Sequence, residues 1–265
     1  MKDFCIILVF DKKFLRKSYI TIKQIRGIGG YKGDIVCVIS DDLKNRINWL
    51  RIDDRVIIKH FPEIDRSKIV NDPGKHPVEA DKKEIVRVCF PMKAKMIHYH
   101  KFYVFHKWFR DNYKKCFYMD TGTQIFKPLD KIINRDCAGK LLAHSDAYPL
   151  YEDTLTCQFD REVFPDLYKE LDDVYNLNID HFQSTVMLYD TSIIQDDTFD
   201  DLWELANHYV NCKTNDQGIL NLYFSCFLDV WEQIPIKDGE TYYYDWRERE
   251  GLTRKDYIML KYPQT

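Results

Sequence analysis

The sequence has no CxxC pair, no long apolar run and no strong excess of charge of either sign. Its eight cysteines stand singly, which argues against a structural zinc site and favours buried thiols in a reducing compartment. The apolar run Phe4–Phe10 is far too short for a transmembrane helix, and neither a basic leader nor a small-residue cleavage site accompanies it. A formal net charge of −3 argues against a dedicated nucleic-acid binder, which needs a dense basic face. We therefore expect a cytoplasmic protein with no membrane span and no nucleic-acid partner; the sequence leaves a homodimer open.

What is present suits one globular domain. A chain of 265 residues with 45% hydrophobic and 31% charged residues can bury a sizeable core. Aromatic residues are abundant, at 15% of the chain with 18 Tyr and 16 Phe. Aromatic rings line carbohydrate and nucleobase sites, but they fill cores more often, so we expect most of them in the core.

Apolar segments alternate with amphipathic ones along the chain. Strands are expected at residues 4–10, 34–40, 55–60, 116–119, 140–144, 186–189 and 257–262, helices at 13–26, 43–50, 92–113, 200–208 and 215–227, and a loop at 62–84. Strand–helix–strand units with short gaps predict an α/β fold with a mostly parallel central sheet flanked by helices. The glycines at 27–30 follow a helix and do not match GxGxxG, which argues against a dinucleotide-binding loop.

The strongest candidate for chemistry is Asp120, which ends the apolar run Cys116–Met119 and precedes a turn of small residues. In open α/β sheets, ligands bind at the carboxyl ends of the strands, so Asp120 is expected where a ligand would lie. An aspartate at that position could also simply cap the turn, because Asp favours such positions.

The segment CFYMDTGTQIFKPLDK at 116–131 resembles the DxD region of GT-A glycosyltransferases, in particular the glycogenin-like (family 8) group. HFQSTVMLYD at 181–190 resembles the strand of that group that touches the donor sugar. NDQGILN at 215–221 resembles its helix start, whose Asp and Gln face the sugar. The first two strands resemble those that hold the nucleoside, so the resemblance covers about residues 4–262.

The resemblance implies a single GT-A (Rossmann-like) domain over 1–265, with a nucleotide-binding half at about 1–130 and a sugar- and acceptor-binding half at about 131–265. It implies transfer of a hexose-type sugar from a UDP-sugar to a hydroxyl group of a glycan, protein or small-molecule acceptor. The donor-binding candidates are Phe10, Asp11, Asp41, Lys101, Asp120, Gly122, Asp146, Gln183 and Ser184. The catalytic candidates are Asp216, Gln217 and Lys261. An aromatic patch at 239–250 suits stacking on a sugar ring or packing of the sheet.

Two departures concern the metal that the family holds. Gly122 replaces the second carboxylate of DxD, and Lys261 is expected where the family has a histidine ligand. Asp120 is then the one metal-ligand candidate, for Mn or Mg. We expect catalysis without a metal, or with weak stimulation by one, in which Lys261 and Lys101 supply positive charge to the diphosphate. The alternative is that Asp120 binds a cation together with water and donor phosphate.

Other interpretations stay open at this stage. Asp216 could belong only to the first turn of a helix, and Lys261 could be a solvated surface lysine. The protein could be a sugar nucleotidyltransferase, or a non-catalytic protein of the same fold that binds a nucleotide sugar or glycan. The sequence does not choose between retention and inversion of configuration.

Overall fold

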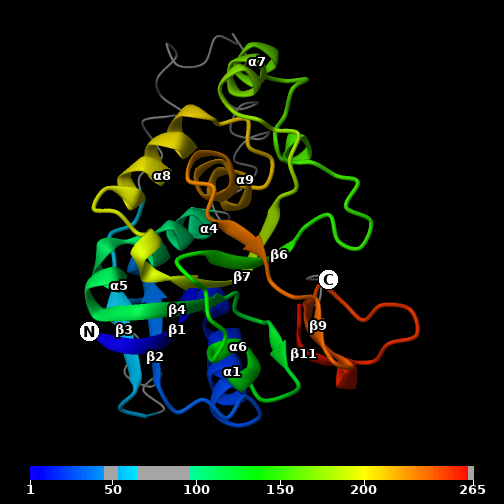
Figure 1. Cartoon of the computed structure of the whole chain (residues 1–265). Helices are drawn as coiled ribbons and strands as arrows, with labels where there is room; N and C mark the ends of the chain where they lie inside the picture. Colours follow the sequence, from blue (N-terminus) through cyan, green and yellow to red (C-terminus); the bar gives the residue numbers. More distant parts are fainter. Residues whose placement is uncertain (45–52, 65–95, 262–265) are drawn as a thin grey trace.

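The computed structural model describes residues 1–44, 53–64 and 96–261, and its main element is a seven-stranded sheet in the order β3-β2-β1-β4-β7-β6-β8 (Figure 1). Its strands are β1 (Lys2–Phe10), β2 (Asp34–Ile39), β3 (Val56–His60), β4 (Tyr113–Met119), β6 (Leu141–Ser145), β7 (Phe182–Asp190) and β8 (Trp231–Gln233). Strand β7 runs antiparallel to both of its neighbours, and the other neighbouring strands pair in parallel. The predicted α/β fold with a mostly parallel sheet is confirmed.

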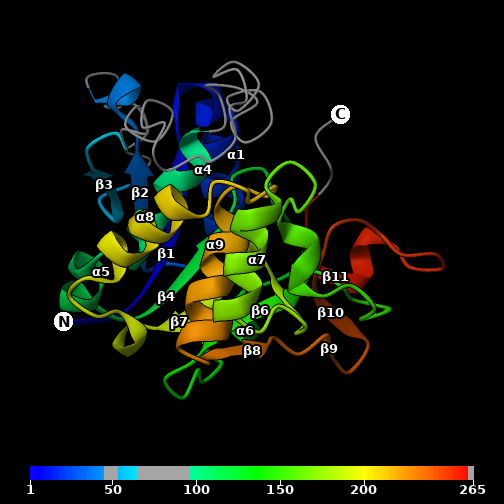
Figure 2. The same cartoon turned by 90° about the horizontal axis from the view of Figure 1, so that it is seen from above.

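Helical segments cover both faces of this sheet (Figures 1 and 2). The α-helices are α1 (Leu15–Arg26), α4 (Met96–His100), α5 (Lys107–Asn112), α6 (Asp130–Ile133), α7 (Pro165–Val174), α8 (Thr198–His208) and α9 (Asp216–Asn221). The 3₁₀ segments are η1 (Lys12–Phe14), η2 (Asp41–Leu43), η5 (Lys101–Phe105), η6 (Leu155–Gln158), η7 (Thr191–Ile193) and η9 (Arg254–Asp256), and η8 (Leu222–Phe227) is a π-helix.

Successive side chains of β1 enter two different apolar cores. Ile7 and Val9 pack into the core that contains η5, α8 and α9, whereas Leu8 and Phe10 pack into the core that contains α1. Because neighbouring side chains of a strand point to opposite faces, a strand that is buried on both faces reads as the continuous apolar run seen in the sequence. Tyr and Phe dominate the largest fully buried side chains, which confirms the expected core role of the aromatics.

A second sheet of four strands brings the end of the chain to the end of β4. It has the order β5-β11-β10-β9, formed by β5 (Gln124–Ile125), β9 (Lys237–Asp238), β10 (Thr241–Asp245) and β11 (Tyr257–Leu260). Strand β11 pairs antiparallel to β5, with Leu260 opposite Gln124. This pairing places residue 261 beside the turn that follows Asp120.

The predicted helix 92–113 is helical over most of its described part, but it is not one continuous helix. Helix α4 gives way to η5, and His106 has an extended backbone and starts the separate helix α5, where its ring accepts a hydrogen bond from the Trp108 amide. Residue Tyr113 already belongs to β4. Helix α7 was not predicted. The predicted helix 43–50 and loop 62–84 lie mostly outside the described residues. The helical run 216–227 changes to π-helix at Leu222. Nowhere in the described chain is a helix long and apolar enough to cross a membrane.

Candidate active site

Asp120 lies directly after β4, at the carboxyl end of the central parallel strands. Its amide donates to the Thr185 carbonyl on the adjacent β7, at 2.8 Å. The turn that follows needs Gly122, whose φ of +89° is strained for residues with a side chain. The Gly122 amide donates to Thr21 of α1 at 3.1 Å, which ties the turn to the helix below it. The position of Asp120 agrees with the sequence-based expectation.

Lys101, the first residue of η5, joins Asp120 to Asp216. Its ammonium nitrogen lies 2.7 Å from Asp216 Oδ2 and 3.5 Å from Asp120 Oδ1, and it donates to the Ser184 hydroxyl at 2.9 Å. Asp216 is the first residue of α9, and its Oδ2 also accepts a hydrogen bond from Ser184 at 2.7 Å. Three segments that are distant in the sequence therefore meet at one buried ammonium group.

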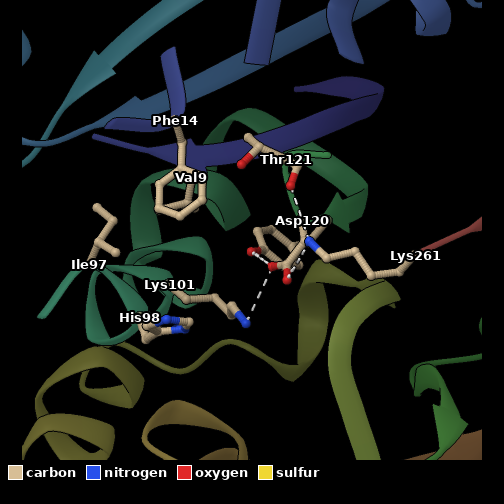
Figure 3. A pocket seen from close by; sticks show the side chains of 9 residues that line it. Val9, Phe14, Ile97, His98, Lys101, Asp120, Thr121 and Lys261 are labelled. Atoms are coloured by element: carbon tan, nitrogen blue, oxygen red, sulfur yellow. Dashed lines mark hydrogen bonds and ion pairs between the residues drawn. The ribbon is translucent and has the colours of Figure 1, made fainter. Parts of the chain in front are cut away.

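Lys261 reaches Asp120 from the other side (Figure 3). Its Nζ lies 3.4 Å from Asp120 Oδ2 and donates to the Thr121 carbonyl at 3.1 Å. Because β11 pairs with β5, the residue after β11 is held at this turn, where its own amide donates to the Asp245 carbonyl at 2.9 Å. The side chain is 7% exposed, so Lys261 is not a solvated surface lysine.

Opposite charges keep this cluster ionised although it is buried. Burial alone would raise the pKa of Asp120, but Lys101 and Lys261, together with a hydrogen bond from Tyr118, hold it well below its usual range. Burial would likewise raise the pKa of Asp216, and Lys101 lowers it. For Lys101, burial favours the neutral amine, and the two carboxylates outweigh that effect and raise its pKa.

A pocket opens beside this charged cluster. Apolar side chains of Val9, Phe14 and Ile97 line one part of it, and Lys101, Asp120 and Lys261 line the other (Figure 3). His98 lies at the same pocket, with Nδ1 3.5 Å from Asp216 Oδ1. An apolar wall that faces ionised groups suits a ligand with a flat ring at one end and a charged group at the other.

Gln217 connects the lysine cluster to a second group of polar side chains. Its Oε1 accepts from the Ser184 amide at 3.2 Å, and its Nε2 donates to Asp146 Oδ2 at 2.9 Å. His181 Nε2 lies 3.4 Å from the same carboxylate oxygen. Burial would lower the pKa of His181, but Asp146 and then Cys157 raise it to about 9. The contact with His181 in turn lowers the pKa of Asp146, although burial would raise it, so opposite charges on the two groups are favoured.

A second pocket lies on the far side of Asp146. Asp146 and Gln183 line it together with Tyr148, Pro149 and the loop from Asp245 to Glu250. The Oε1 atom of Gln183 is buried and accepts no hydrogen bond from the described residues. Trp246 from the predicted aromatic patch is 37% exposed at this pocket. A pocket whose wall contains a carboxylate, an amide side chain and an exposed indole ring suits a sugar.

The remaining candidates lie at the ends of β1 and β2. Phe10 is fully buried in the core, so a donor contact through its ring is not available. Asp11 accepts from the Phe14 amide at 3.1 Å, and burial raises its pKa. Asp41 accepts from the His60 ring, which lowers its pKa. These carboxylates follow their strands as expected, and a role in nucleoside binding stays a prediction.

Sequence reasoning missed several groups of the site. Tyr118 donates to Asp120 Oδ1, and Gln158 contacts both Asp146 and Gln217. Tyr118 lies two residues before Asp120 and therefore on the same face of β4, a signal that strand periodicity offered. Gln158 comes from η6, a segment without any recognised pattern, so only the fold reveals it.

The residues around Asp120 do not fit a tightly bound divalent cation. No group of three or more His, Cys, Asp or Glu side chains within residues 1–44, 53–64 and 96–261 is arranged to hold a metal ion. Gly122 offers no side chain, and the two oxygens of Asp120 already face ammonium groups. Since two ammonium groups carry the charge of one divalent cation, the site has the positive charge without the metal ligands.

No protein-family model matches the sequence, and the comparison with curated proteins gives no match. Solved glycosyltransferase structures match the fold. An active-site mutant of LgtC is 12% identical, with 98% of this chain and 88% of LgtC aligned at a TM-score of 0.60. The galactosyltransferase LgtC in complex with donor and acceptor sugar analogues is also 12% identical, with 91% of this chain and 75% of LgtC aligned at a TM-score of 0.57. The bifunctional glycosyltransferase WbbM is 15% identical and aligns with 100% of this chain at a TM-score of 0.59, although the chain spans only 46% of WbbM.

These matches cover nearly the whole chain, and at such low identities they establish the fold. The seven-stranded sheet with one antiparallel strand and helices on both faces agrees with the expectation from the sequence motifs. The chain has the α/β fold of GT-A glycosyltransferases, as its resemblance to the glycogenin-like group predicts.

Proposed function

We propose that the protein is a glycosyltransferase that moves a hexose-type sugar from a UDP-sugar to a hydroxyl acceptor without a tightly bound metal. The observation that carries this proposal is the cluster in which Lys101 and Lys261 flank Asp120 at the pocket beside β4. The GT-A fold makes a sugar nucleotide the natural ligand of a pocket at the carboxyl ends of these strands.

The nucleotide half, about residues 1–130, would hold the uridine and the diphosphate. Phe14 and Val9 offer an apolar wall for the base, and Asp11 and Asp41 are available for ribose hydroxyls at the strand ends. Lys101 and Lys261 lie where the diphosphate would approach Asp120. Ammonium groups fixed in a pocket stabilise the negative charge that grows on a departing diphosphate, which is the main demand of this reaction.

The other half, about residues 131–265, would hold the sugar and the acceptor. Asp216 and Gln217 stand between the two pockets, and Asp146, Gln183 and Ser184 surround them. In this arrangement the sugar lies between the lysine cluster and Asp146, and the acceptor enters beside Trp246. Asp216 is the candidate base if the reaction inverts configuration, although its ion pair with Lys101 lowers its basicity.

The second candidate is a non-catalytic protein that binds a nucleotide sugar or glycan. Gly122 takes the place of a metal-binding carboxylate, and the ion pairs of Lys101 and Lys261 could serve binding without transfer. Calorimetric titration with a panel of UDP-sugars, followed by an assay for released UDP, separates the two. The proposal predicts selective binding of one donor and slow release of UDP. Selective binding with no release in the presence of varied acceptors would favour the binding protein, and no binding of any donor would contradict both.

A further inference from the structure

All charged residues of the segment between Asp11 and Asp34 are basic. It contains seven cations and no acidic residue, whereas Asp and Glu make up about one residue in six of the whole chain, 42 of 265. The seven are Lys12, Lys13, Arg16, Lys17, Lys23, Arg26 and Lys32. Subtracting their charges from the formal net charge of −3 leaves −10 for the rest of the chain. The sequence of this segment is therefore positively charged, whereas the rest of the sequence carries a net negative charge.

Helix periodicity gathers most of these cations on one outer face. In α1, Ser18, Ile22 and Ile25 are buried toward the sheet. Arg16, Ile20 and Lys23 are spaced by four and three residues, so they share the opposite face, and all three are exposed. The exposed Lys12 and Lys13 lie in η1, directly before this helix. We name this surface the basic stripe: Lys12, Lys13, Arg16 and Lys23 around Ile20.

The charged side chains of the basic stripe form no ion pair with a carboxylate among the described residues, although Asp42 accepts hydrogen bonds from the backbone amide of Lys12. Arg26, at the end of the same helix, shows the usual alternative, an ion pair with Asp53 at 2.7 Å. Lys13 and Lys23 instead lie over the rings of Phe14 and Tyr19, at 5.8 and 4.6 Å from the ring centres. An ordinary solvated helix face mixes charges of both signs and gains from pairing them, and this face does not.

Two exposed isoleucines accompany the cations. Ile20 is 48% exposed in the middle of the basic stripe, and Ile28, just after α1, is 51% exposed. Helices that bind in the plane of a membrane surface combine exposed apolar side chains with Lys and Arg. Contacts to a nucleic-acid backbone gain from the cations alone, and exposed isoleucine adds nothing to them. The combination favours a lipid surface.

We propose that the basic stripe is a docking surface for a bilayer rich in anionic phospholipids. Its cations would contact lipid phosphates, and Ile20 would enter the boundary between head groups and acyl chains. The negative remainder of the chain would be repelled, which fixes the orientation of the bound protein. Phe14, between Lys13 and α1, lines the pocket of Asp120, so docking would hold the mouth of that pocket near the membrane surface. This proposal does not depend on the proposed reaction.

Co-sedimentation of the full chain with vesicles tests this proposal. One vesicle preparation contains equal parts of phosphatidylglycerol and phosphatidylcholine, and the other contains phosphatidylcholine alone. The test variant is Arg16→Glu/Lys23→Glu, and the matched control is Lys169→Glu/Lys255→Glu, which reverses two exposed lysines on other elements. Ile20→Ser tests the apolar contribution without a change of charge. Thermal unfolding verifies that each variant folds, and Arg16→Gln/Lys23→Gln replaces the test variant if charge reversal prevents folding.

The proposal predicts binding to the anionic vesicles only, weakened by about tenfold or more in the Arg16/Lys23 variant and unchanged in the control. Ile20→Ser is expected to weaken binding by a smaller factor. Failure of the wild-type protein to bind the anionic vesicles would overturn the proposal, as would equal losses in the test and control variants. Tighter binding of a DNA duplex than of vesicles, with no effect of Ile20→Ser, would assign the stripe to nucleic acid instead.

Discussion

The ammonium nitrogen of Lys261 lies 3.4 Å from Asp120 Oδ2, although the two residues are separated by 141 positions in the sequence. Pairing of β11 with β5 creates this contact, because it holds the end of the described chain beside the turn after β4. Lys101 approaches the other oxygen of the same carboxylate. Two ammonium groups thus flank Asp120, and the proposed transfer without a metal rests on this arrangement.

Removal of the charge of Lys101 should destabilise the fold strongly. Lys101→Met would leave the buried Asp216 without its ammonium partner, whereas the half-buried Asp120 would keep Lys261. Breaking a buried ion pair costs about 3–5 kcal/mol. The free energy of unfolding from urea denaturation measures the effect. Lys101→Arg keeps the charge and is expected to lose clearly less. Equal stability of Lys101→Met and the wild-type protein would show that the ion network is not buried as described.

Restoring carboxylate and imidazole ligands should create a metal site. The variant Gly122→Asp/Lys261→His would place a second carboxylate and an imidazole beside Asp120, and Mn²⁺ accepts both groups as ligands. A Cβ at position 122 would lie 3.6 Å from Lys17 Cδ, an ordinary contact, although φ of +89° adds strain of roughly 1–3 kcal/mol. Calorimetric titration with Mn²⁺ should show saturable binding in this variant and none in the wild-type protein.

The matched control for that titration is Gly122→Ala/Lys261→Met, which has the same backbone strain and the same loss of the ammonium group but adds no ligands. Binding of Mn²⁺ by the control as strongly as by the ligand variant would mean that Asp120 holds the cation alone. Tight binding by the wild-type protein would contradict the account directly.

Stability should fall as the pH rises through the pKa of His181. Folding raises this pKa from 6.5 to about 9, so the imidazolium is favoured in the folded protein. Protonation of His181 contributes up to about 3 kcal/mol to the free energy of unfolding. This contribution is complete below pH 6.5 and is lost as the pH approaches 9. Urea denaturation over this range should show the decline in the wild-type protein and a flatter profile in His181→Asn. Parallel profiles for the two proteins would refute the assignment.

Cys157 should be the most reactive of the described thiols. A hydrogen bond from His181 lowers its pKa, and the side chain is exposed, whereas burial raises the pKa of Cys226 to about 11. Iodoacetamide at neutral pH should therefore modify Cys157 at least about tenfold faster than Cys226, as followed by peptide mass spectrometry. His181→Asn should remove most of the difference. An unchanged rate at Cys157 in that variant would show that exposure alone controls the reaction.

The sequence predicted the strands of the central sheet well because each is a short apolar run that ends at polar residues. β1, β2 and β4 are buried on both faces, so their apolar character is continuous and easily recognised. The interruption of the helix predicted at 92–113 was missed because residues 102–105 are all buried apolar residues, which no amphipathic pattern separates from the neighbouring helices. The extended backbone at His106, which ends η5, has no strong signal in the sequence.

Within the candidate site, the motifs identified Asp120 and Asp216, which mark the ends of recognisable elements. The partners of these residues were harder to find. Gln158 and His181 join the site through contacts between η6, β7 and α9, and such contacts follow from packing and not from local patterns. Lys261 was inferred from a weak motif near the chain end, and its place became clear only through the β5–β11 pairing.

Release of UDP with and without metal tests the central claim most directly. The best-bound UDP-sugar would be incubated with the protein in EDTA and, in parallel, with added Mn²⁺, and the released UDP would be measured in both. The account predicts release in EDTA at a rate within about twofold of that with Mn²⁺, and a large loss in Lys261→Met under both conditions. Release that disappears in EDTA and returns with Mn²⁺ would contradict the account, because it would place a metal ion where Lys261 is proposed to act.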